Sequence, residues 1–353
     1  MRVELLEPDA ARWHETVASM RHDFYHLPSY VRLSATYDGG EPRAVYAEDG
    51  ACRLLLPVIV RRVGGGMLDA ASPYGYPGPL LSGPRSFVRS AWDATRERLR
   101  AEGLVSLFIR LHPLLNADRP EGVGVIVEHG ETVSVDLTLP TEELWRQTMS
   151  GHRNEINRAL RAGHRAYIDE GWEHLSTFGR LYRATMERLG AAGYYFFPDR
   201  YFEQLRDALG DRLRLAVVDI GGTIAAAGLF AETAAIVQYH LSGSDEAFTH
   251  DSPIKLLLQF VRGWAKERKN LWMHLGGGVG GKQDSLFRFK AGFSHSRHPF
   301  RTLRVVLDKA AYAELVRAHD PTVDPTQLDG FFPLYRRPAT TTQESESCAL
   351  PAR

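Results

Sequence analysis

The sequence predicts an α/β fold with mixed sheets, arranged as two modules of about 150 residues each. Its length of 353 residues exceeds what one hydrophobic core usually organises. Hydrophobic residues make up 44% of the chain and charged residues 24%, as in ordinary globular proteins. Helix and strand signals alternate, hairpins recur, and the alternation begins again near residue 140. Because hairpins join antiparallel strands, a purely parallel sheet does not fit this pattern.

The first module alternates short strands with helices. The expected strands are Val3–Glu7, Pro42–Glu48, Cys52–Val63 and Leu104–Leu111, and the expected helices are Asp9–Met20, Pro28–Tyr37 and Pro84–Glu102. Glu48-Asp49-Gly50 supplies turn residues between the second and third strands, which predicts a hairpin. A loop rich in Gly, Pro and Tyr follows at residues 72–79.

The second module repeats the alternation. Helices are expected at residues 141–148, 152–162, 174–189, 200–209 and 253–269, and strands at residues 212–219, 223–231, 234–241 and 271–275. Thr141 and Asp199 are expected to cap the helices that they open. Ser252-Pro253 is the sharpest helix start, because Ser suits the N-cap and Pro the first helical position. Residues 337–353 hold too few apolar side chains to offset their ordering entropy, and we expect a disordered tail.

Charge and cysteine content exclude several classes of protein. Lys plus Arg and Asp plus Glu both number 43, so no overall field attracts the chain to nucleic acid or membrane, although a local basic groove stays open. The two cysteines, Cys52 and Cys348, offer neither a disulfide framework nor metal-ligand spacing, and no metal is expected. No signal peptide is evident, and Leu54–Val60 is far shorter than the roughly 20 residues of a membrane helix. We therefore expect a cytoplasmic protein without a membrane span.

A glycine run follows the last strand of the second module. Gly276 to Lys282 matches the G-x-x-x-x-G-K pattern of a P-loop, but Gln283 stands where Ser or Thr would ligate Mg²⁺. The run also matches G-x-G-x-x-G, with Asp308 as a candidate ribose ligand, but a dinucleotide domain needs more chain after that strand. The alternative is that the glycines let the backbone pass close to a ligand or another chain segment.

The segment after the glycine run combines cations with aromatic residues. Six cations lie between residues 282 and 304, against the single acid Asp284. Phe287, Phe289 and Phe293 interleave with these cations and are expected to pin the segment into a core. A lysine fixed in this way, here Lys290, is able to stabilise an oxyanion, which a mobile surface lysine does less well. The alternative is a solvated basic face.

Other polar residues offer weaker signals. The expected strand ending at Leu241 leads through Ser242-Gly243-Ser244 toward a helix start, a recurrent location for anionic ligands. Tyr239 and His240 are expected to point to opposite faces of this strand. His240 and His274 are more simply explained as hydrogen-bonded structural residues than as catalytic ones. The arginines Arg153, Arg158, Arg161 and Arg165 form either a solvated helix face or a groove for phosphate. No covalent or metal-dependent catalytic motif is present.

Several of these segments, in this order, resemble the FemABX family of aminoacyl-tRNA-dependent transferases, within the GNAT-like superfamily. The segments that carry the resemblance are Ser72–Pro79, Arg153–Ile156 with Arg158, Ala159 and Gly163, Tyr239–Ser244, Ser252-Pro253 with Leu256-Leu257, Leu275–Gly277 and Phe287–Phe293. The last is the most specific, because the family's Phe-Lys pair maps onto Phe289 and Lys290.

The resemblance implies two tandem GNAT-like domains. The first covers residues 1–140 and is completed by residues 305–336, through strand Leu303–Leu307 and helix Lys309–His319, and the second covers residues 141–304. It implies transfer of an aminoacyl group from charged tRNA to an amine, often in a peptidoglycan precursor, without a resident cofactor. Lys290 and Phe289 are the expected catalytic residues. The expected substrate-binding residues are Tyr74, Tyr76, Arg153, Tyr239, Ser242, Ser244, Asp284 and Arg288. The working expectation is a monomer, although the sequence leaves the oligomeric state open.

Two departures from the family pattern qualify this hypothesis. No heptad run is long enough for the coiled-coil arm that some members carry. Where members that bind muramyl peptides tend to have a lysine after an early aromatic-led helix, this chain has Tyr30-Val31-Arg32-Leu33-Ser34. A secondary-metabolite amine or peptide is therefore an alternative acceptor.

Two alternative functions remain open. One is an N-acyltransferase of the same fold that uses acyl-CoA. Residues 242–255 hold a single glycine, Gly243, and no Arg or Gln, so they lack the usual R/Q-x-x-G-x-G/A motif. The other is a binding module without catalysis.

Overall fold

The computed structural model describes residues 1–116 and 122–338, and divides the chain into two compact units. Unit 1 comprises Met1–Gly130 and Pro299–Arg353, and unit 2 comprises Glu131–His298. The sequence analysis placed the boundaries at 140/141 and 304/305. Strands β7 (Val125–Asp136) and β13 (Ser296–Val306) run through the observed boundaries, so no linker composition marks these positions. The expected disordered tail lies, from residue 339 onward, outside the described residues.

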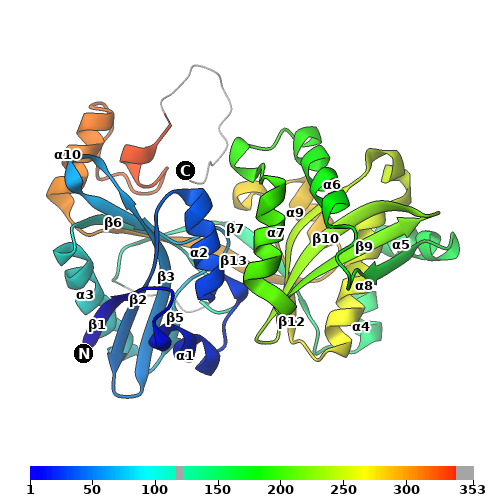
Figure 1. The fold of residues 1–353 in the computed structure, drawn as a ribbon, viewed down its shortest axis with the longest axis horizontal. Coiled ribbons are helices and arrows are strands. Elements are labelled where there is room, and N and C mark those ends of the chain that lie inside the picture. Colours follow the sequence, from blue (N-terminus) through cyan, green and yellow to red (C-terminus); the bar gives the residue numbers. More distant parts are fainter. Residues whose placement is uncertain (117–121, 339–353) are drawn as a thin grey trace. The chain divides into compact units, whose positions relative to one another are not determined.

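Unit 1 contains a mixed sheet in the order β1-β2-β3-β4-β6-β13, with β5 paired to β3 (Figure 1). The remaining strands are β1 (Arg2–Leu6), β2 (Glu41–Asp49), β3 (Cys52–Arg62), β4 (Leu68–Ala71), β5 (Leu80–Ser82) and β6 (Leu104–Arg110). All neighbours are antiparallel except β4 and β6, which are parallel. Helix α3 (Arg85–Ala101) connects β5 to β6. The expected hairpin is confirmed, with Asp49 opposite Cys52.

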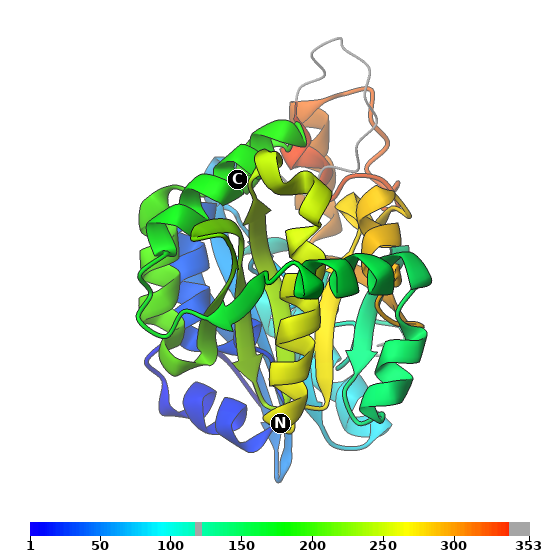
Figure 2. The same ribbon diagram turned by 90° about the vertical axis from the view of Figure 1, so that its right-hand side faces the viewer.

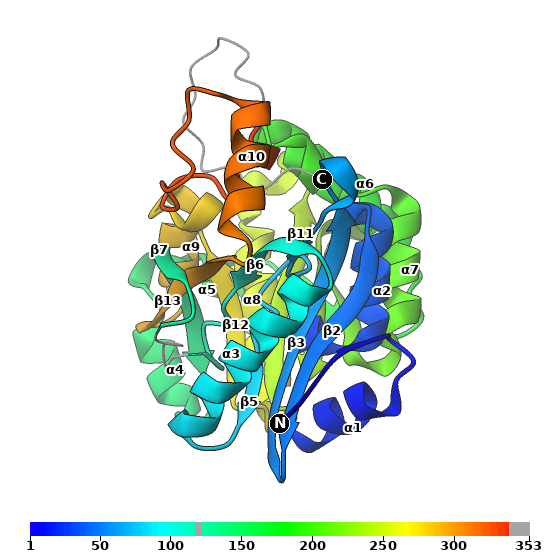
Figure 3. The ribbon, with the colours of Figure 1, turned by 90° about the vertical axis from the view of Figure 1, so that its left-hand side faces the viewer.

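The side chains of β2 and β3 alternate between two hydrophobic layers in unit 1. Val45, Leu54 and Leu56 belong to the core beneath α3, with Trp92 from that helix (Figure 3). The opposite face is covered by α1 (Ala11–Ser19) and α2 (Pro28–Asp38), and α10 (Lys309–His319) packs against β6. The alternation follows the two-residue period of a strand and buries both faces of the sheet.

Unit 2 contains a second mixed sheet, in the order β7-β12-β11-β10-β9-β8. Its other strands are β8 (Arg165–Ile168), β9 (Leu213–Ile220), β10 (Thr223–Thr233), β11 (Ile236–Ser244) and β12 (Trp272–Gly277). Only β11 and β12 are parallel, and α8 (Pro253–Glu267) lies between them in the sequence. Each unit thus has four successive antiparallel strands, a helical crossover, a parallel fifth strand and an antiparallel sixth strand from a distant segment. This shared topology is the tandem arrangement that the sequence predicted.

Helices cover both faces of the sheet in unit 2. Helices α5 (Ser150–Arg161) and α8 pack on one face with Ala216 and Val218 of β9, as Figure 2 shows for α8. The alternating residues Leu215 and Val217 are buried on the other face, where α6 (Leu175–Arg188) and α7 (Asp199–Leu209) lie. The remaining helices of the unit are α4 (Thr141–Gln147) and α9 (Ser285–Ala291).

Three predicted helix caps are wrong. The N-cap positions of α4 and α7 are Pro140 and Pro198, so Thr141 and Asp199 are already helical and cap nothing. Ser252 does precede α8, but it adopts a left-handed conformation (φ 52°) and its hydroxyl donates to the Glu155 carboxylate instead of accepting from the helix. In each case a tertiary contact or a proline replaces the local cap.

The sequence analysis also missed β7, β8 and α9, and it ended β11 three residues too early. The longest helix in the described residues is α3, with 17 residues, so this part of the chain holds no coiled-coil arm. None of the helices in the same residues combines the length and hydropathy needed to cross a bilayer.

Candidate functional site

The candidate site is built around α9, which carries the Phe289-Lys290 pair. Asp284 is the N-cap of this helix, and its Oδ1 accepts a hydrogen bond of 2.8 Å from the Phe287 backbone N–H. Phe287 and Phe293 are buried in the core of unit 2, and Phe289 packs against that core from a half-buried position. The cap and the aromatic anchors therefore fix a helix of only two turns, which would not be stable alone.

The glycine run folds around the same carboxylate. Asp284 Oδ2 accepts a hydrogen bond of 2.9 Å from the Val279 backbone N–H. A Cβ added at Gly278 would lie 2.3 Å from Asp284 Oδ1 and 2.1 Å from the Lys282 carbonyl oxygen. The glycines thus let the loop close on another segment of its own chain, as the simpler alternative held, and the loop surrounds a protein carboxylate where a P-loop would surround phosphate.

Lys290 is buried, with 9% of its surface exposed. Its Nζ donates to the Gly277 carbonyl oxygen at 2.8 Å and lies 5.8 Å from the centroid of the Tyr239 ring. Burial lowers the pKa of Lys290 from 10.5 to about 8, and the Asp284 carboxylate acts in the opposite direction. The Gly277 contact is the only hydrogen bond of this ammonium within the described residues, so two of its three N–H groups have no acceptor there.

The ammonium lies where two parallel strands stop pairing. The ladder between β11 and β12 covers Ile236–Gln238 and Trp272–His274. Beyond these residues the two strands no longer pair, and Lys290 contacts Tyr239 of β11 and Gly277 of β12. This position at the carboxyl ends of parallel strands is where open α/β sheets commonly bind ligands.

A β-bulge shapes the same part of β11. Leu229 pairs with Leu241 and Phe230 with Tyr239, which leaves His240 as the extra residue. Tyr239 and Ser242 would face opposite sides in a regular strand, but here their hydroxyl groups form a short hydrogen bond. The bulge therefore joins Ser242 to the site beside Lys290. Periodicity alone did not predict this, because a bulge leaves no clear signal in a single sequence.

The other expected substrate-binding residues of unit 2 lie in structural contacts. Arg153 Nη1 donates to three carbonyl oxygens at the end of α4, at 2.9 to 3.3 Å. The Ser244 backbone bonds the hydroxyl of Thr185 on α6. Arg288 is exposed and donates to the Gln283 carbonyl oxygen at 3.1 Å. The structure thus links Tyr239 to Lys290 and Ser242 to Tyr239. Arg153 and Arg288 instead donate to neighbouring backbone carbonyl groups, and the Ser244 backbone is held by side chains of α6.

Three of the four arginines for which the sequence left open a solvated face or a phosphate groove make contacts within the protein. Arg158 donates to the His250 carbonyl oxygen, and Arg165 forms an ion pair of 3.3 Å with Asp219. With Arg153 held by α4, Arg161 is left as the remaining cation of that set. These contacts indicate that the arginines attach the helix to neighbouring segments, and they do not form a row of phosphate ligands.

In unit 1, Tyr74 and Tyr76 lie on the loop at residues 72–79, which is tightly held. Tyr30 donates to the Tyr74 carbonyl oxygen at 2.9 Å, and the Tyr76 ring packs edge-on against Tyr25 and Phe300. A Cβ added at Gly75, where φ is 102°, would overlap the Tyr25 ring at 2.0 Å. Both tyrosines are half-buried on a rigid support, as a binding surface requires.

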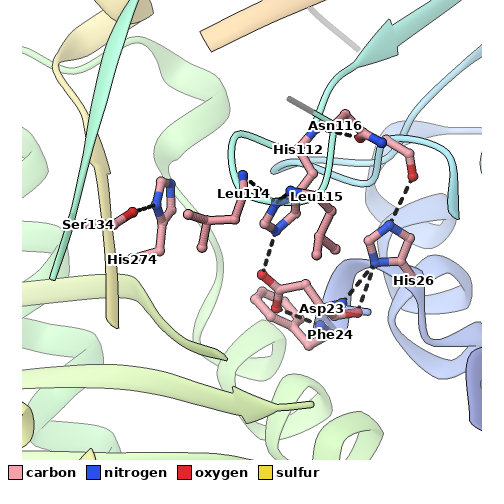
Figure 4. A network of polar contacts seen from close by, with 10 residues as sticks. Asp23, Phe24, His26, His112, Leu114, Leu115, Asn116, Ser134 and His274 are labelled. Atoms are coloured by element: carbon pink, nitrogen blue, oxygen red, sulfur yellow. Dashed lines mark hydrogen bonds and ion pairs between the residues drawn. The ribbon is translucent and has the colours of Figure 1, made fainter. Parts of the chain in front are cut away.

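A buried polar network anchors the other end of this loop (Figure 4). His112 donates through Nε2 to Asp23 Oδ2 at 2.9 Å, while its Nδ1 accepts from the backbone N–H groups of Leu114 and Leu115. His26 Nε2 donates to the Gly78 carbonyl oxygen at 2.9 Å, and burial lowers the pKa of His26 to about 4. Both ring nitrogens of His112 are occupied, so this histidine is a structural pin.

The two histidines considered for catalysis in unit 2 lie in strands. His274 of β12 is fully buried and its Nδ1 is 2.8 Å from the Ser134 hydroxyl, which is also visible in Figure 4. His240 is the bulged residue of β11. Among the described residues, no three or more His, Cys, Asp or Glu side chains gather as a metal site.

The arrangement suits a reaction in which negative charge develops on a carbonyl oxygen. A fixed ammonium, beside the hydroxyl pair of Tyr239 and Ser242, offers hydrogen-bond donors in a site of low dielectric constant.

Comparisons with known proteins place the fold. A family model described as an acetyltransferase (GNAT) domain matches residues 146–290. No curated protein sequence matches significantly. Among solved structures, FemX has a TM-score of 0.70 at 14% identity, covering 88% of this chain and 99% of that chain. L-PGS from Bacillus licheniformis has a TM-score of 0.54 at 16% identity, covering 85% and 92%. A conserved protein of unknown function from Bacteroides thetaiotaomicron has a TM-score of 0.57 at 11% identity, covering 86% and 100%.

At these identities the structural matches establish the fold, while the matched GNAT domain contains β8 to β12 and ends at Lys290. The chain therefore has a FemABX-like GNAT acyltransferase fold, in two tandem copies.

Proposed function

We propose that this protein transfers an aminoacyl group from charged tRNA to the amine of a small molecule or peptide. The observation that carries the proposal is the position of Lys290, buried where β11 and β12 part and bonded to the Gly277 carbonyl oxygen. A charge is costly to bury, and its retention beside two hydroxyl groups points to a task for the ammonium.

The proposed reaction uses an ester that is already activated. The acceptor nitrogen attacks the ester carbonyl carbon, and the carbonyl oxygen becomes an oxyanion to which Lys290 donates hydrogen bonds. The C–O bond to the tRNA ribose then breaks, an amide remains, and the amine proton leaves with the ribose oxygen or through solvent. Such oxyanion donors are worth about 10² to 10³ in rate. Phe289 and Phe287 hold the helix that carries the ammonium.

Tyr239, Ser242 and Asp284 are the proposed contacts around this ammonium, since the Tyr239 ring lies 5.8 Å from Nζ, Ser242 bonds the Tyr239 hydroxyl group and the Asp284 carboxylate favours the charged form. Tyr74 and Tyr76 are proposed to bind the acceptor from their rigid loop in unit 1. We propose a cytoplasmic location, where charged tRNA is available, and a monomeric enzyme. Because the stretch Tyr30-Val31-Arg32-Leu33-Ser34 offers no lysine of the kind that members binding muramyl peptides tend to carry, we propose a secondary-metabolite amine alongside a peptidoglycan precursor as acceptor.

An acyl-CoA donor is the second candidate, since the fold alone admits it. The start of α8, where a pyrophosphate would be expected, is surrounded by acids. Asp245, Glu246 and Asp251 precede the helix, and the Glu155 carboxylate bonds Ser252 and Lys255 at its first turn. These negative charges disfavour a pyrophosphate at this position. The third candidate, a binding module without catalysis, leaves the cost of burying Lys290 unexplained.

One experiment separates the three candidates. The full chain is incubated with a pool of amine acceptors and either radiolabelled aminoacyl-tRNAs or labelled acetyl-CoA, with and without RNase. We expect transfer from aminoacyl-tRNA that RNase abolishes. Acetylation that resists RNase would replace the proposal with the acyl-CoA alternative, and the absence of transfer from both donors would favour the binding module.

A further inference from the structure

His152 of α5 lies directly against the helix that carries Lys290. It is 5% exposed, and its Nε2 lies 3.0 Å from the Phe289 carbonyl oxygen. Because a carbonyl oxygen only accepts, Nε2 must carry the proton. The imidazole also packs against the Phe289 and Phe293 rings, at centroid distances of 5.5 and 4.9 Å. One histidine thus contacts the residues on both sides of the lysine.

Gly292 explains why an imidazole fits there. Its φ of −67° and ψ of −7° are available to any residue, so its backbone conformation does not require glycine. A Cβ at this position would instead lie 2.6 Å from His152 Nε2 and 2.8 Å from His152 Cε1. The glycine after Lys290-Ala291 therefore makes room for the ring of His152, and the two residues form a matched pair.

A second contact strengthens the same junction. The backbone N–H of Met149, which precedes α5, donates to the Gly292 carbonyl oxygen at 2.8 Å. The carbonyl group of Phe289 near the end of α9 and that of Gly292, the C-cap, therefore both receive donors from the start of α5. This junction fixes the end of a two-turn helix, while Asp284 fixes its beginning.

We propose that His152, with Gly292 as its steric partner, is a positioning residue for Lys290. The importance of this residue for catalysis rests on the proposed function, but its effect on the position of Lys290 does not. The hydrogen bond to the Phe289 carbonyl oxygen holds the backbone beside Lys290, so that Nζ reaches the Gly277 carbonyl oxygen. Loss of this contact releases the end of α9, and the ammonium moves toward solvent.

The first test observes Lys290 itself and requires no activity. The sequence holds only six lysines, so labelling with ¹³C,¹⁵N-lysine gives a simple spectrum, in which Lys290 is identified by its loss in Lys290→Arg. In the unaltered protein this lysine is expected to titrate near pH 8. In His152→Leu and Gly292→Ala its pKa is expected to rise by about one unit or more toward the solvent value. His152→Gln, which keeps a donor at the same reach, is expected to preserve the native value.

A matched control separates positioning from general destabilisation. Lys266 in the same unit donates to the carbonyl oxygens of Leu137 and Leu139 at 2.8 and 2.7 Å, away from α9. Lys266→Met is expected to lower the melting temperature without moving the Lys290 titration. An unchanged Lys290 pKa in His152→Leu, or an equal change in Lys266→Met, would overturn the proposal even if the protein transfers no aminoacyl group.

The second test uses the transfer reaction. His152→Leu and Gly292→Ala are expected to lower kcat about tenfold or more with KM little changed, and His152→Gln to recover most of the loss. In the double variant His152→Ala with Gly292→Ala, the methyl group fills space that the ring has left. The fold-loss in kcat of the double variant is therefore expected to be smaller than the product of the losses measured in His152→Ala and Gly292→Ala alone. Strict additivity would show that the two residues do not act as a pair.

Discussion

At the scale of the residue, Lys290 combines a thermodynamic cost with a chemical use. Burial disfavours its charged form and holds its pKa near 8, whereas an unfolded lysine titrates near 10.5. Folding therefore opposes protonation of this group: the cost is fully present below about pH 8 and disappears as pH rises from 8 to 10.5. The lowered pKa limits this cost to about 3 kcal/mol. An interaction that stabilised the charged lysine in the folded protein would raise its pKa, whereas burial lowers it. The lysine is therefore better explained by a role in function than by a role in stability.

Replacing Lys290 should separate stability from activity. Lys290→Met is expected to reduce the transfer rate about 10²-fold or more, the scale of one oxyanion donor, and to raise the melting temperature at pH 7 because the buried charge is removed. Thermal unfolding and single-turnover transfer on the same preparation check both effects. As a control, exposed Lys309 changed to Met should alter neither. Wild-type transfer rates in Lys290→Met would remove this lysine from the mechanism.

The pH dependence distinguishes an ammonium donor from an amine base. If the charged form acts, kcat at saturating acceptor should fall as pH rises through about 8, after subtraction of spontaneous ester hydrolysis. In Lys290→Arg any remaining activity should lack this alkaline limb, because the guanidinium stays charged. The groups that face the ammonium are the Asp284 carboxylate and Tyr239, whose pKa burial raises to about 12. A rate that rises through pH 8 would instead assign Lys290 as the base.

At the scale of the element, α9 shows why sequence patterns singled out these residues without predicting the structure that holds them. In Phe287-Arg288-Phe289-Lys290 aromatic residues and cations alternate with a period of two, which favours a strand. The segment is helical because Asp284 caps it and α5 holds its end, and both are contacts outside the periodic pattern. By contrast, long helices with a full apolar face, such as α3 and α8, were predicted closely. Strand β7 was not predicted because charged residues interrupt its hydrophobic alternation at residues 128–131.

Asp284 should link the stability of α9 to the charge of Lys290. Asp284→Ala removes the cap on Phe287 and the bond to Val279, and is expected to cost about 1 kcal/mol in stability. Asp284→Asn keeps a cap oxygen but loses the charge. Since that carboxylate raises the pKa of Lys290, both variants should move the alkaline limb of kcat to lower pH.

Thermal unfolding and pH–rate profiles of the two Asp284 variants separate these effects. Asp284→Ala should lose more stability than Asp284→Asn, which keeps an acceptor for Phe287 and loses the one for Val279, while both should shift the alkaline limb. If the alkaline fall of kcat occurs at the same pH in Asp284→Asn as in the unaltered protein, the carboxylate does not influence the pKa of the ammonium.

At the scale of the whole molecule, the tandem topology came from local patterns together with a family resemblance. The strand and helix signals indicated one module used twice, but no periodicity shows that β13 pairs with β6, almost two hundred positions earlier in the sequence. That pairing makes unit 1 discontinuous. Its closure is reinforced by Asp69, 1% exposed at its side chain, which binds Arg61, Arg336 and the Tyr335 hydroxyl. Ion pairs between such distant positions leave no mark in one sequence.

The segment that follows α10, residues 320–338, should therefore be essential to the stability of unit 1 and dispensable for that of unit 2. Truncation after His319 removes Tyr335 and Arg336 from Asp69 and strips Phe332 and Leu334 from the core under α10. A buried carboxylate loses two of its partners and an apolar layer is opened, so we expect unit 1 to lose about 3 kcal/mol or more. Limited proteolysis should then cleave unit 1 first and leave a fragment near residues 131–298. Truncation after Pro338 retains all these contacts and serves as the control. If both truncated proteins resist protease equally, the segment that follows α10 does not hold unit 1 together.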